Sequence, residues 1–295
     1  MKLPPILQLL RPAQWVKNAF VLLPLFFGQR MTDVHLLTLA IVAAVVFSLA
    51  ASAVYCLNDI LDREADAQHP VKCRRPLASG AVSVPAGWAA CAACVALAAA
   101  LTLWLLPPSM MWLMAAYLAL NVAYSVWLKH VSLIDVLVVA VFYVMRVEAG
   151  SLTTGIALSQ WLVVMTFLLA LLLVLGKRRD DVVLQAEGGK VVRRGAARYN
   201  IDFINMALTM VATITIVAYM MYTMSDEVTT RLGNHHIYCT TVFVLAGILR
   251  YLQITLVENK SGSPTQVLAR DRFIQACLAC WVMAFVFIIY VANPA

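Results

Sequence analysis

Nine apolar runs constrain this chain more than any other feature of its sequence. A helix needs roughly 20 predominantly apolar residues to cross the hydrocarbon of a bilayer. Closed barrels also satisfy the backbone in lipid, but these runs are too long for barrel strands and do not alternate with a period of two. We therefore predict an all-α integral membrane protein, a single domain over residues 1–295 with nine transmembrane helices. The runs cover residues 17–30, 35–58, 84–106, 109–128, 133–152, 160–176, 203–224, 237–257 and 273–291.

Basic residues are divided unevenly between the connections that join these runs. Of the 22 Lys and Arg residues, 19 fall in alternate connections on one side, Arg30 and Arg231 fall on the other side, and Arg146 lies within a run. Because basic loops stay in the cytoplasm, we expect a cytoplasmic N-terminus and an outer C-terminus. The net charge of +7 then lies at the inner face, where it favours anionic headgroups and anionic substrates. No nucleic-acid partner is expected, and a homo-oligomer is left open.

A polar segment, CLNDILDREADAQHPVKCRRPLASG, follows the second run. At about 100° per residue, the side chains of Asn58, Asp59, Asp62 and Asp66 share one arc of a helix, while Glu64 points away. A solvated helix end would scatter its charges, and neighbouring carboxylates repel by several kcal/mol at an effective dielectric near 20. Mg²⁺ prefers oxygen ligands and combines a few carboxylates with substrate phosphates. We therefore predict a Mg²⁺ site formed by the four stripe residues, with the three Asp as catalytic carboxylates.

Three basic residues, Lys72, Arg74 and Arg75, come within ten residues of this stripe. Neutralising the carboxylates alone does not explain them, because the proposed cation already does so. A pyrophosphate group, bridged to the carboxylates by Mg²⁺ and bound by the basic side chains, would compensate both sets of charges. The segment therefore indicates a site for a phosphorylated substrate at the cytoplasmic mouth of the bundle.

Two motifs then carry a resemblance to a known family. NDILDREAD fits the pattern NDxxDxxxD, and together with HPVKCRRPLASG it resembles the UbiA-type intramembrane prenyltransferase superfamily. YSVWLKHVSLIDVLVVAVFYVMRVEAG is similar to the Tyr, Lys and Asp segment of that superfamily, here Tyr124, Lys129 and Asp135. The resemblance covers nearly the whole chain. It implies a nine-helix bundle with its active site at the cytoplasmic mouth.

The sequence departs from part of that superfamily after the sixth run. Members that prenylate aromatic acceptors have a second pair of Asp, spaced by three residues, whereas LLLVLGKRRDDVV places Lys177, Arg178 and Arg179 ahead of Asp180 and Asp181. Basic residues in place of acids argue that a second anion binds there directly. We assign Lys177 and Arg178 to that anion and read Arg179 as an ordinary inside charge. The role of the two Asp is left open.

Four further segments, LRPAQWVKN, GKRR, ARYNIDFIN and GSPTQVLARDR, together resemble the decaprenyl-phosphate phosphoribosyltransferase branch. That resemblance implies Mg²⁺-dependent transfer of a 5-phosphoribosyl group from phosphoribosyl pyrophosphate to a polyprenyl phosphate, with release of pyrophosphate. It also implies that the enzyme lies in the inner membrane of a bacterium and makes a precursor of cell-wall arabinan. The alternative is transfer of an isoprenyl group from its diphosphate to an aromatic or quinone-precursor acceptor. A transporter would gather its polar groups near the bilayer midplane, whereas here they gather at one mouth.

Site roles follow from the resemblance. Gln14 and Lys17 are assigned to the lipid phosphate, although ordinary interfacial anchoring beside Trp15 would also explain them. Arg146 lies about 16 Å deeper than the start of its run and is left outside the site, since Glu148 is available to pair with it. The donor's phosphates and ribose are assigned to Lys72, Arg74, Arg75, Tyr124, Lys129, Asp135, Lys177 and Arg178.

Overall fold

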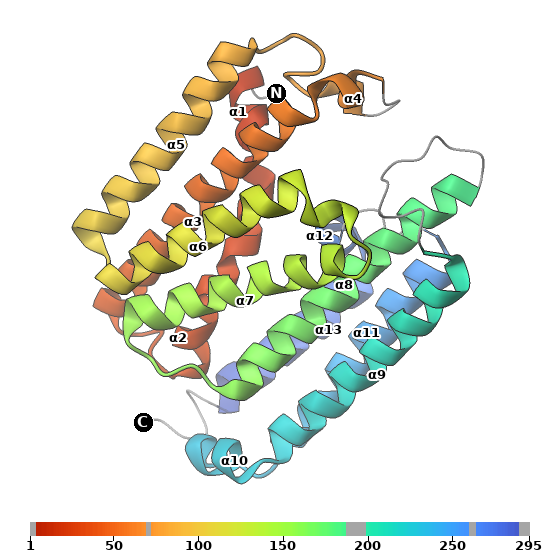
Figure 1. The fold of residues 1–295 in the computed structure, drawn as a ribbon. Helices are drawn as coiled ribbons and strands as arrows, with labels where there is room; N and C mark the ends of the chain where they lie inside the picture. The colour runs from red at the N-terminus through yellow and green to blue at the C-terminus, as the bar shows by residue number, and fades with distance from the viewer. Residues whose placement is uncertain (1–3, 69–71, 187–198, 260–263, 289–295) are drawn as a thin grey trace. The chain divides into compact units, whose positions relative to one another are not determined.

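A computed structural model describes residues 4–68, 72–186, 199–259 and 264–288, and every regular element in these ranges is helical (Figure 1). In the described residues, seven helices are long and apolar enough to cross a membrane. The prediction of a multi-pass, all-helical protein is thereby confirmed. The seven are α3 (Val34–Leu61), α5 (Val84–Leu105), α6 (Pro108–Val126), α7 (Ile134–Thr154), α8 (Gln160–Ala186), α9 (Ile201–Met224) and the stretch Ile237–Leu256, in which η5 (Ile237–Thr240) leads into α11 (Thr241–Leu256).

The predicted count of nine spans is not confirmed, and the first apolar run accounts for much of the difference. Instead of one continuous helix, the chain forms the 3₁₀ helix η1 (Pro12–Leu22) followed by the short helix α2 (Leu23–Phe27). Pro24 lies in the first turn of α2, where its missing N–H costs no hydrogen bond and its fixed φ starts a new helix. At the other end of the chain, α13 (Arg272–Val286) has 15 residues, and the predicted ninth span runs beyond the described residues.

Polar caps fix where several of these helices begin. The carboxylate of Asp33 accepts hydrogen bonds from the backbone N–H groups of His35 and Leu36 at the start of α3. Asn200 caps α9 and Asp271 caps α13 in the same manner. Each cap satisfies N–H groups that have no partner within the helix.

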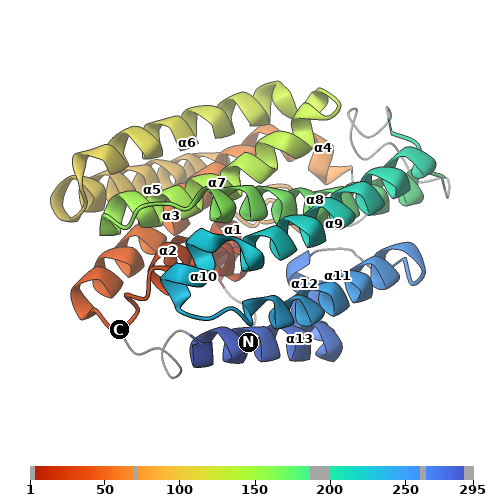
Figure 2. The same ribbon diagram turned by 90° about the horizontal axis from the view of Figure 1, so that it is seen from below.

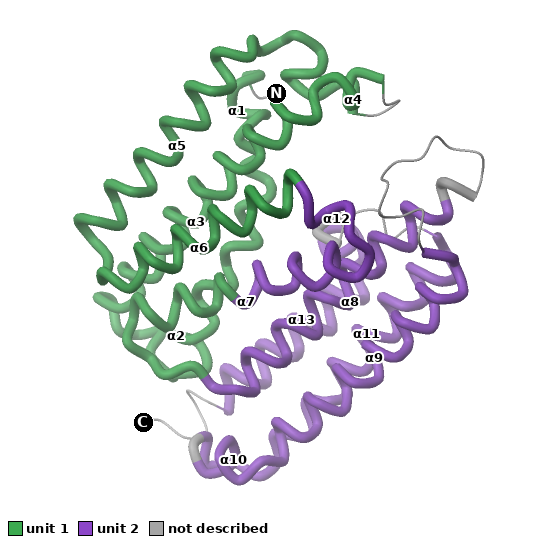
Figure 3. Tube along the Cα trace, viewed as in Figure 1, with its two compact units in different colours: residues 1–126, 145–158 green, residues 127–144, 159–295 purple. Residues whose placement is uncertain are grey.

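The chain divides into two compact units, which are described separately (Figure 3). The first unit comprises residues 1–126 and 145–158. In it, α3 packs along α5 and also contacts α6, η1 and α1 (Pro5–Leu10). Small residues let these backbones approach closely. Gly150 lies on the part of α7 that belongs to this unit. It packs against η1 so closely that a Cβ there would collide with the backbone carbonyl of Val21.

The second unit comprises residues 127–144 and 159–295. Helices α8 and α9 run side by side, and α11 contacts both α9 and α13 (Figures 1 and 2). Leu172, Leu208 and Tyr251 are buried in their shared core. Gly176 makes room for the Tyr251 hydroxyl against α8. Two further short elements, α4 (Arg63–Ala67) and η2 (Lys72–Arg74), belong to the first unit. The second unit also contains η3 (Leu128–His130), α10 (Asp226–Leu232) and α12 (Pro264–Arg270).

Candidate functional site

The acidic segment follows a helical path, but it is not one continuous helix. Helix α3 ends at Leu61, and α4 begins after Asp62, which joins the two with φ −92° and ψ 6°. The backbone N–H of Asp62 still donates to the carbonyl of Asn58, and that of Asp66 donates to Asp62. Backbone hydrogen bonding therefore continues across the joint at Asp62, an interruption of the helix that the spacing of the acidic residues did not reveal.

Two of the four predicted metal ligands lie together, with a basic residue between them. Asp59 and Asp66 are buried. The Nη1 atom of Arg75 lies 3.1 Å from Asp59 Oδ1 and 2.5 Å from Asp66 Oδ2. One nitrogen atom reaches both carboxylates, so a single cation at that position would contact both. The structure brings Asp59, Asp66 and Arg75 together, whereas the sequence suggested that Arg75 binds the substrate's phosphates.

Asp59 has a second cationic partner, Arg11, to which the sequence gave no role in the site. Its Nη2 atom lies 2.6 Å from Asp59 Oδ1, and its guanidinium lies 4.9 Å from the centre of the Tyr55 ring. Arg11 has a left-handed backbone, φ 53°, at the joint between α1 and η1. That joint is fixed to α3 because the Ser52 hydroxyl donates to the Leu10 carbonyl.

The ion pairs correct one step of the sequence argument. The carboxylates do not require a metal for compensation, since the guanidinium groups of Arg11 and Arg75 balance Asp59 and Asp66. Among the described residues, no group of three or more His, Cys, Asp or Glu side chains is arranged to hold a metal ion. The oxygen donors nevertheless fit Mg²⁺ in kind, and the two buried carboxylates both face the same nitrogen atom of Arg75.

Other predicted ligands in the first unit lie on neighbouring elements. Lys72 is half-buried and Arg74 is exposed, both on the 3₁₀ turn η2. Tyr124 is half-buried near the end of α6. Gln14 and Lys17 are half-buried on η1, the element that follows Arg11. Asn58, in the last turn of α3, and Asp62, between α3 and α4, are half-buried.

A second charged cluster forms in the second unit around Asp135, at the start of α7. Arg178 donates through Nε to Asp135 Oδ2 at 2.6 Å and through Nη1 to Asp181 Oδ2 at 2.9 Å. The Tyr199 hydroxyl donates to Asp135 Oδ1 at 2.8 Å and accepts from the backbone N–H of Leu133. Burial raises the pKa of the Tyr199 phenol, so it remains a neutral donor at pH 7.

This cluster changes the roles that the sequence suggested. Arg178 and Asp135 were both assigned to the phosphorylated donor, yet the structure gives them to each other, and both are buried. Asp181, whose role was open, neutralises Arg178. Lys177, the preceding residue on α8, is exposed. Lys129 is half-buried on η3. The cluster therefore ties the C-terminal part of α8 to the start of α7, and Lys177 is the exposed cation of the basic triplet.

The interpretation of Arg179 as an ordinary inside charge is wrong. Arg179 is buried. Its guanidinium donates to the backbone carbonyls of Thr255 and Leu256, the last carbonyls of α11, and to the side-chain oxygens of Asn205 and Asn259. It thereby satisfies helix-end acceptors that have no partner within α11. Three successive helical residues point about 100° apart, so the triplet could not turn all of its charges toward one site.

Arg146 also has an unexpected environment, within the first unit. It is buried and donates through Nε to Asn18 Oδ1 at 2.8 Å and through Nη2 to the Tyr117 hydroxyl at 3.3 Å. The rings of Phe47 and Tyr117 lie 5.9 and 5.5 Å from its guanidinium. Arg146 therefore links α7 to η1 and α6, whereas the sequence suggested Glu148 as its partner.

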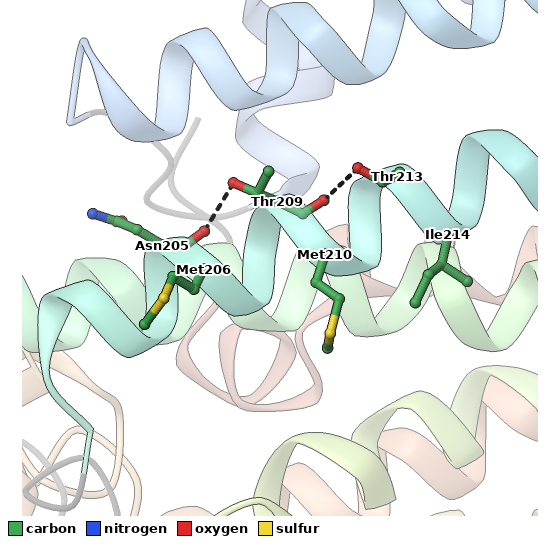
Figure 4. Close-up of a pocket in the computed structure, with 6 residues that line it drawn as sticks. All are labelled: Asn205, Met206, Thr209, Met210, Thr213 and Ile214. Atoms are coloured by element: carbon green, nitrogen blue, oxygen red, sulfur yellow. Dashed lines mark hydrogen bonds between the residues drawn. The ribbon is translucent and has the colours of Figure 1, made fainter.

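A hollow of about 530 Å³ lies along one face of α9 in the second unit (Figure 4). Thr209 and Thr213 turn their hydroxyls back to backbone carbonyls one turn earlier, as the dashed lines show. The lining is therefore mostly apolar. It consists of Asn205, Met206, Thr209, Met210, Thr213 and Ile214.

The chain is similar to known proteins over most of its length. Residues 19–178 match the UbiA prenyltransferase family. A decaprenyl-phosphate phosphoribosyltransferase of Mycobacterium tuberculosis is 33% identical over 94% of this chain and 91% of the relative. The protein of the same name from Corynebacterium glutamicum is 31% identical, over 97% of this chain and 87% of the relative. A UbiA homologue from Archaeoglobus fulgidus, solved with GPP and Mg²⁺, is 19% identical and superposes with a TM-score of 0.70 over 97% and 100% of the two chains.

Proposed function

Because this chain belongs to the UbiA prenyltransferase family, we propose which of the family's substrates it uses. It transfers a 5-phosphoribosyl group from phosphoribosyl pyrophosphate to a polyprenyl phosphate and releases pyrophosphate. The observation that carries this proposal is the C-terminal part of α8, where Lys177, Arg178 and Asp181 stand in place of a second, metal-binding pair of Asp. The names of the relatives at 31–33% identity agree with it.

The first step binds the donor at the carboxylate stripe. Asn58, Asp59, Asp62 and Asp66 would hold Mg²⁺, which supplies positive charge to the departing pyrophosphate. Arg74 and Lys72, on the loop after the stripe, offer further cations to the same phosphates. Tyr124 and Lys129 are assigned to the donor as well. The carboxylates and the basic loop thus stabilise negative charge as it develops on the leaving group.

The acceptor needs no side chain that acts as a general base to remove a proton. A phosphate monoester has a second pKa of about 6, so the polyprenyl phosphate is already largely ionised at neutral pH. Its oxygen attacks C1 of the ribose as the bond to pyrophosphate breaks, and attack from the opposite face inverts the configuration at that carbon. Gln14 and Lys17 are assigned to the lipid phosphate, with the isoprenoid between apolar helices. The reaction is proposed to occur at the cytoplasmic mouth in the bacterial inner membrane, with the N-terminus inside and the C-terminus outside.

Lys177→Ala is expected to raise the KM for phosphoribosyl pyrophosphate about tenfold, with a smaller change in kcat. Lys177 is exposed in the C-terminal part of α8, and a charge-assisted contact to a phosphate is worth about 1.5–3 kcal/mol. Steady-state rates over a range of donor concentrations measure the effect. Lys177→Arg keeps the charge and should restore most of the affinity. An unchanged KM in the Ala variant would show that the second anion binds elsewhere.

Removal of divalent cations is expected to abolish transfer. The purified protein is treated with EDTA, assayed, and then supplied with Mg²⁺ or with Ca²⁺. Mg²⁺ should restore the rate, and Ca²⁺ should restore less because it adopts larger and less regular coordination. Full turnover in EDTA would refute the metal site.

Transfer assays on membranes distinguish the proposal from the prenyltransferase alternative. One assay supplies radiolabelled phosphoribosyl pyrophosphate with a polyprenyl phosphate, and the other supplies a labelled prenyl diphosphate with 4-hydroxybenzoate. We expect label in the lipid fraction that depends on added polyprenyl phosphate. Label in the aromatic acid and none in the first assay would support the alternative.

A further inference from the structure

The two guanidinium groups at the carboxylate stripe lie where a metal ion would have to bind. Arg11 and Arg75 contact Asp59 at 2.6 and 3.1 Å, and Arg75 also contacts Asp66. The two carboxylates carry two negative charges and the two guanidinium groups carry two positive charges, so this cluster is electrically balanced. A cation that binds between Asp59 and Asp66 must therefore displace resident cations.

The exposures of the four side chains differ in a way that matters for this exchange. The carboxylate side chains are 2% and 5% exposed, whereas those of Arg11 and Arg75 are 28% and 29% exposed. The carboxylates are fixed on α3 and α4, and the arginines reach them from the N-terminal joint and the basic loop. The guanidinium groups are therefore the members of the cluster that can move outward.

Electrostatics then decides which ligand can displace them. Bare Mg²⁺ would take the carboxylates and leave two guanidinium groups without anions beside a poorly solvated site, which is costly. A pyrophosphoryl donor brings several negative charges together with the metal, and its oxygens match the forked guanidinium donors. The displaced arginines then have new partners.

We propose that Arg11 and Arg75 couple metal binding to donor binding: they occupy Asp59 and Asp66 until the divalent cation arrives with a diphosphate, and then bind its phosphate oxygens. The inference rests on the proposed function, because it takes the stripe as the site for Mg²⁺ and the donor. It adds Arg11 to the residues that bind the donor.

Binding of Mn²⁺ to the purified full-length protein tests this coupling. The probes are Mn²⁺ alone and the preformed manganese–pyrophosphate complex, and electron paramagnetic resonance measures the free ion. For the unsubstituted protein we expect the complex to bind at least tenfold more tightly than Mn²⁺ alone. Arg11→Ala should strengthen binding of Mn²⁺ alone about tenfold and weaken binding of the complex. A purely structural role for Arg11 would not change the affinities for Mn²⁺ alone and for the complex in opposite directions.

Two further variants provide the controls. Arg63→Ala removes an exposed positive charge from α4, in the same acidic segment, and should leave both affinities unchanged, which excludes a general effect of net charge. Arg11→Lys keeps the charge and should bind Mn²⁺ alone as weakly as the unsubstituted protein does. Thermal unfolding of each variant confirms that it is folded. If Arg11→Ala does not fold, the comparison of Mn²⁺ alone with the manganese–pyrophosphate complex in the unsubstituted protein still tests the coupling.

Each contrary result has a definite meaning. If Arg11→Ala and Arg63→Ala shift Mn²⁺ binding equally, or if Mn²⁺ alone already binds as tightly as the complex, the coupling is refuted while the phosphoribosyl transfer assay can still succeed. If neither probe binds and transfer also fails, the proposed function itself is refuted.

Discussion

Asp62→Asn is expected to lower the rate of phosphoribosyl transfer at least a hundredfold while the protein stays folded. The amide has nearly the same shape as the carboxylate but carries no charge, and removal of one group that stabilises a transition-state charge costs about 10²–10³ in rate. Asp62 suits this test because it is half-buried at the joint between α3 and α4. Substitution of Asp59 or Asp66 would instead leave the half-buried guanidinium groups of Arg11 and Arg75 without their full complement of negative charge. Initial rates with radiolabelled donor measure the loss.

Glu64→Gln is the matched control for that variant. Glu64 is exposed on α4, two residues further along the same segment. The substitution removes the same charge from the same region, and its rate should stay within about twofold of the unsubstituted protein because it does not remove a ligand. Equal losses in the two variants would mean that overall charge matters and that Asp62 has no specific role. Full activity of Asp62→Asn would remove it from the site.

Arg179→Ala is expected to lower the free energy of unfolding by about 3 kcal/mol. The substitution takes donors away from the carbonyls of Thr255 and Leu256 at the end of α11, and from the side-chain oxygens of Asn205 and Asn259. Thr255 is fully buried, so water cannot readily replace the lost donor. Unfolding of the purified protein in detergent micelles, by heat or by added denaturing detergent, measures the change.

The control for this variant is Arg270→Ala. Arg270 is exposed at the end of α12 in the same unit, and its removal should change stability by less than about 0.5 kcal/mol. If both variants unfold at the same temperature as the unsubstituted protein, the hydrogen bonds of Arg179 contribute nothing to stability, and the interpretation of a structural clamp is wrong.

Hydropathy predicted most of the fold because a bilayer imposes one length and one polarity on every spanning helix. Seven of the predicted runs became helices of that kind. The first run was misjudged for a physical reason. Its composition is apolar, but Pro24 starts a separate helix and the preceding residues wind as a 3₁₀ helix. Hydropathy measures partition into lipid and does not detect such breaks.

In the candidate site and its surroundings, the sequence suggested contacts between residues near in sequence and missed those between distant residues. Asp59, Asp66 and Arg75 lie within 17 residues of one another, so helical spacing suggested that the two carboxylates lie together, and nearness in the sequence suggested Arg75. Arg11 reaches Asp59 across 48 residues, Arg179 reaches Thr255 across 76, and Arg146 reaches Asn18 across 128. The sequence showed the positive charge of each of these arginines but did not identify its partner. Its partner depends on how helices pack, which spacing within one segment does not encode.

Mass spectrometry of the lipid that the purified protein makes is the most direct measurement. Phosphoribosyl pyrophosphate, a polyprenyl phosphate, a prenyl diphosphate and 4-hydroxybenzoate are supplied together with Mg²⁺. We expect one new lipid, the polyprenyl phosphate enlarged by a phosphoribosyl group, and an equal amount of released pyrophosphate. A prenylated aromatic acid beside unchanged polyprenyl phosphate would contradict the proposed function.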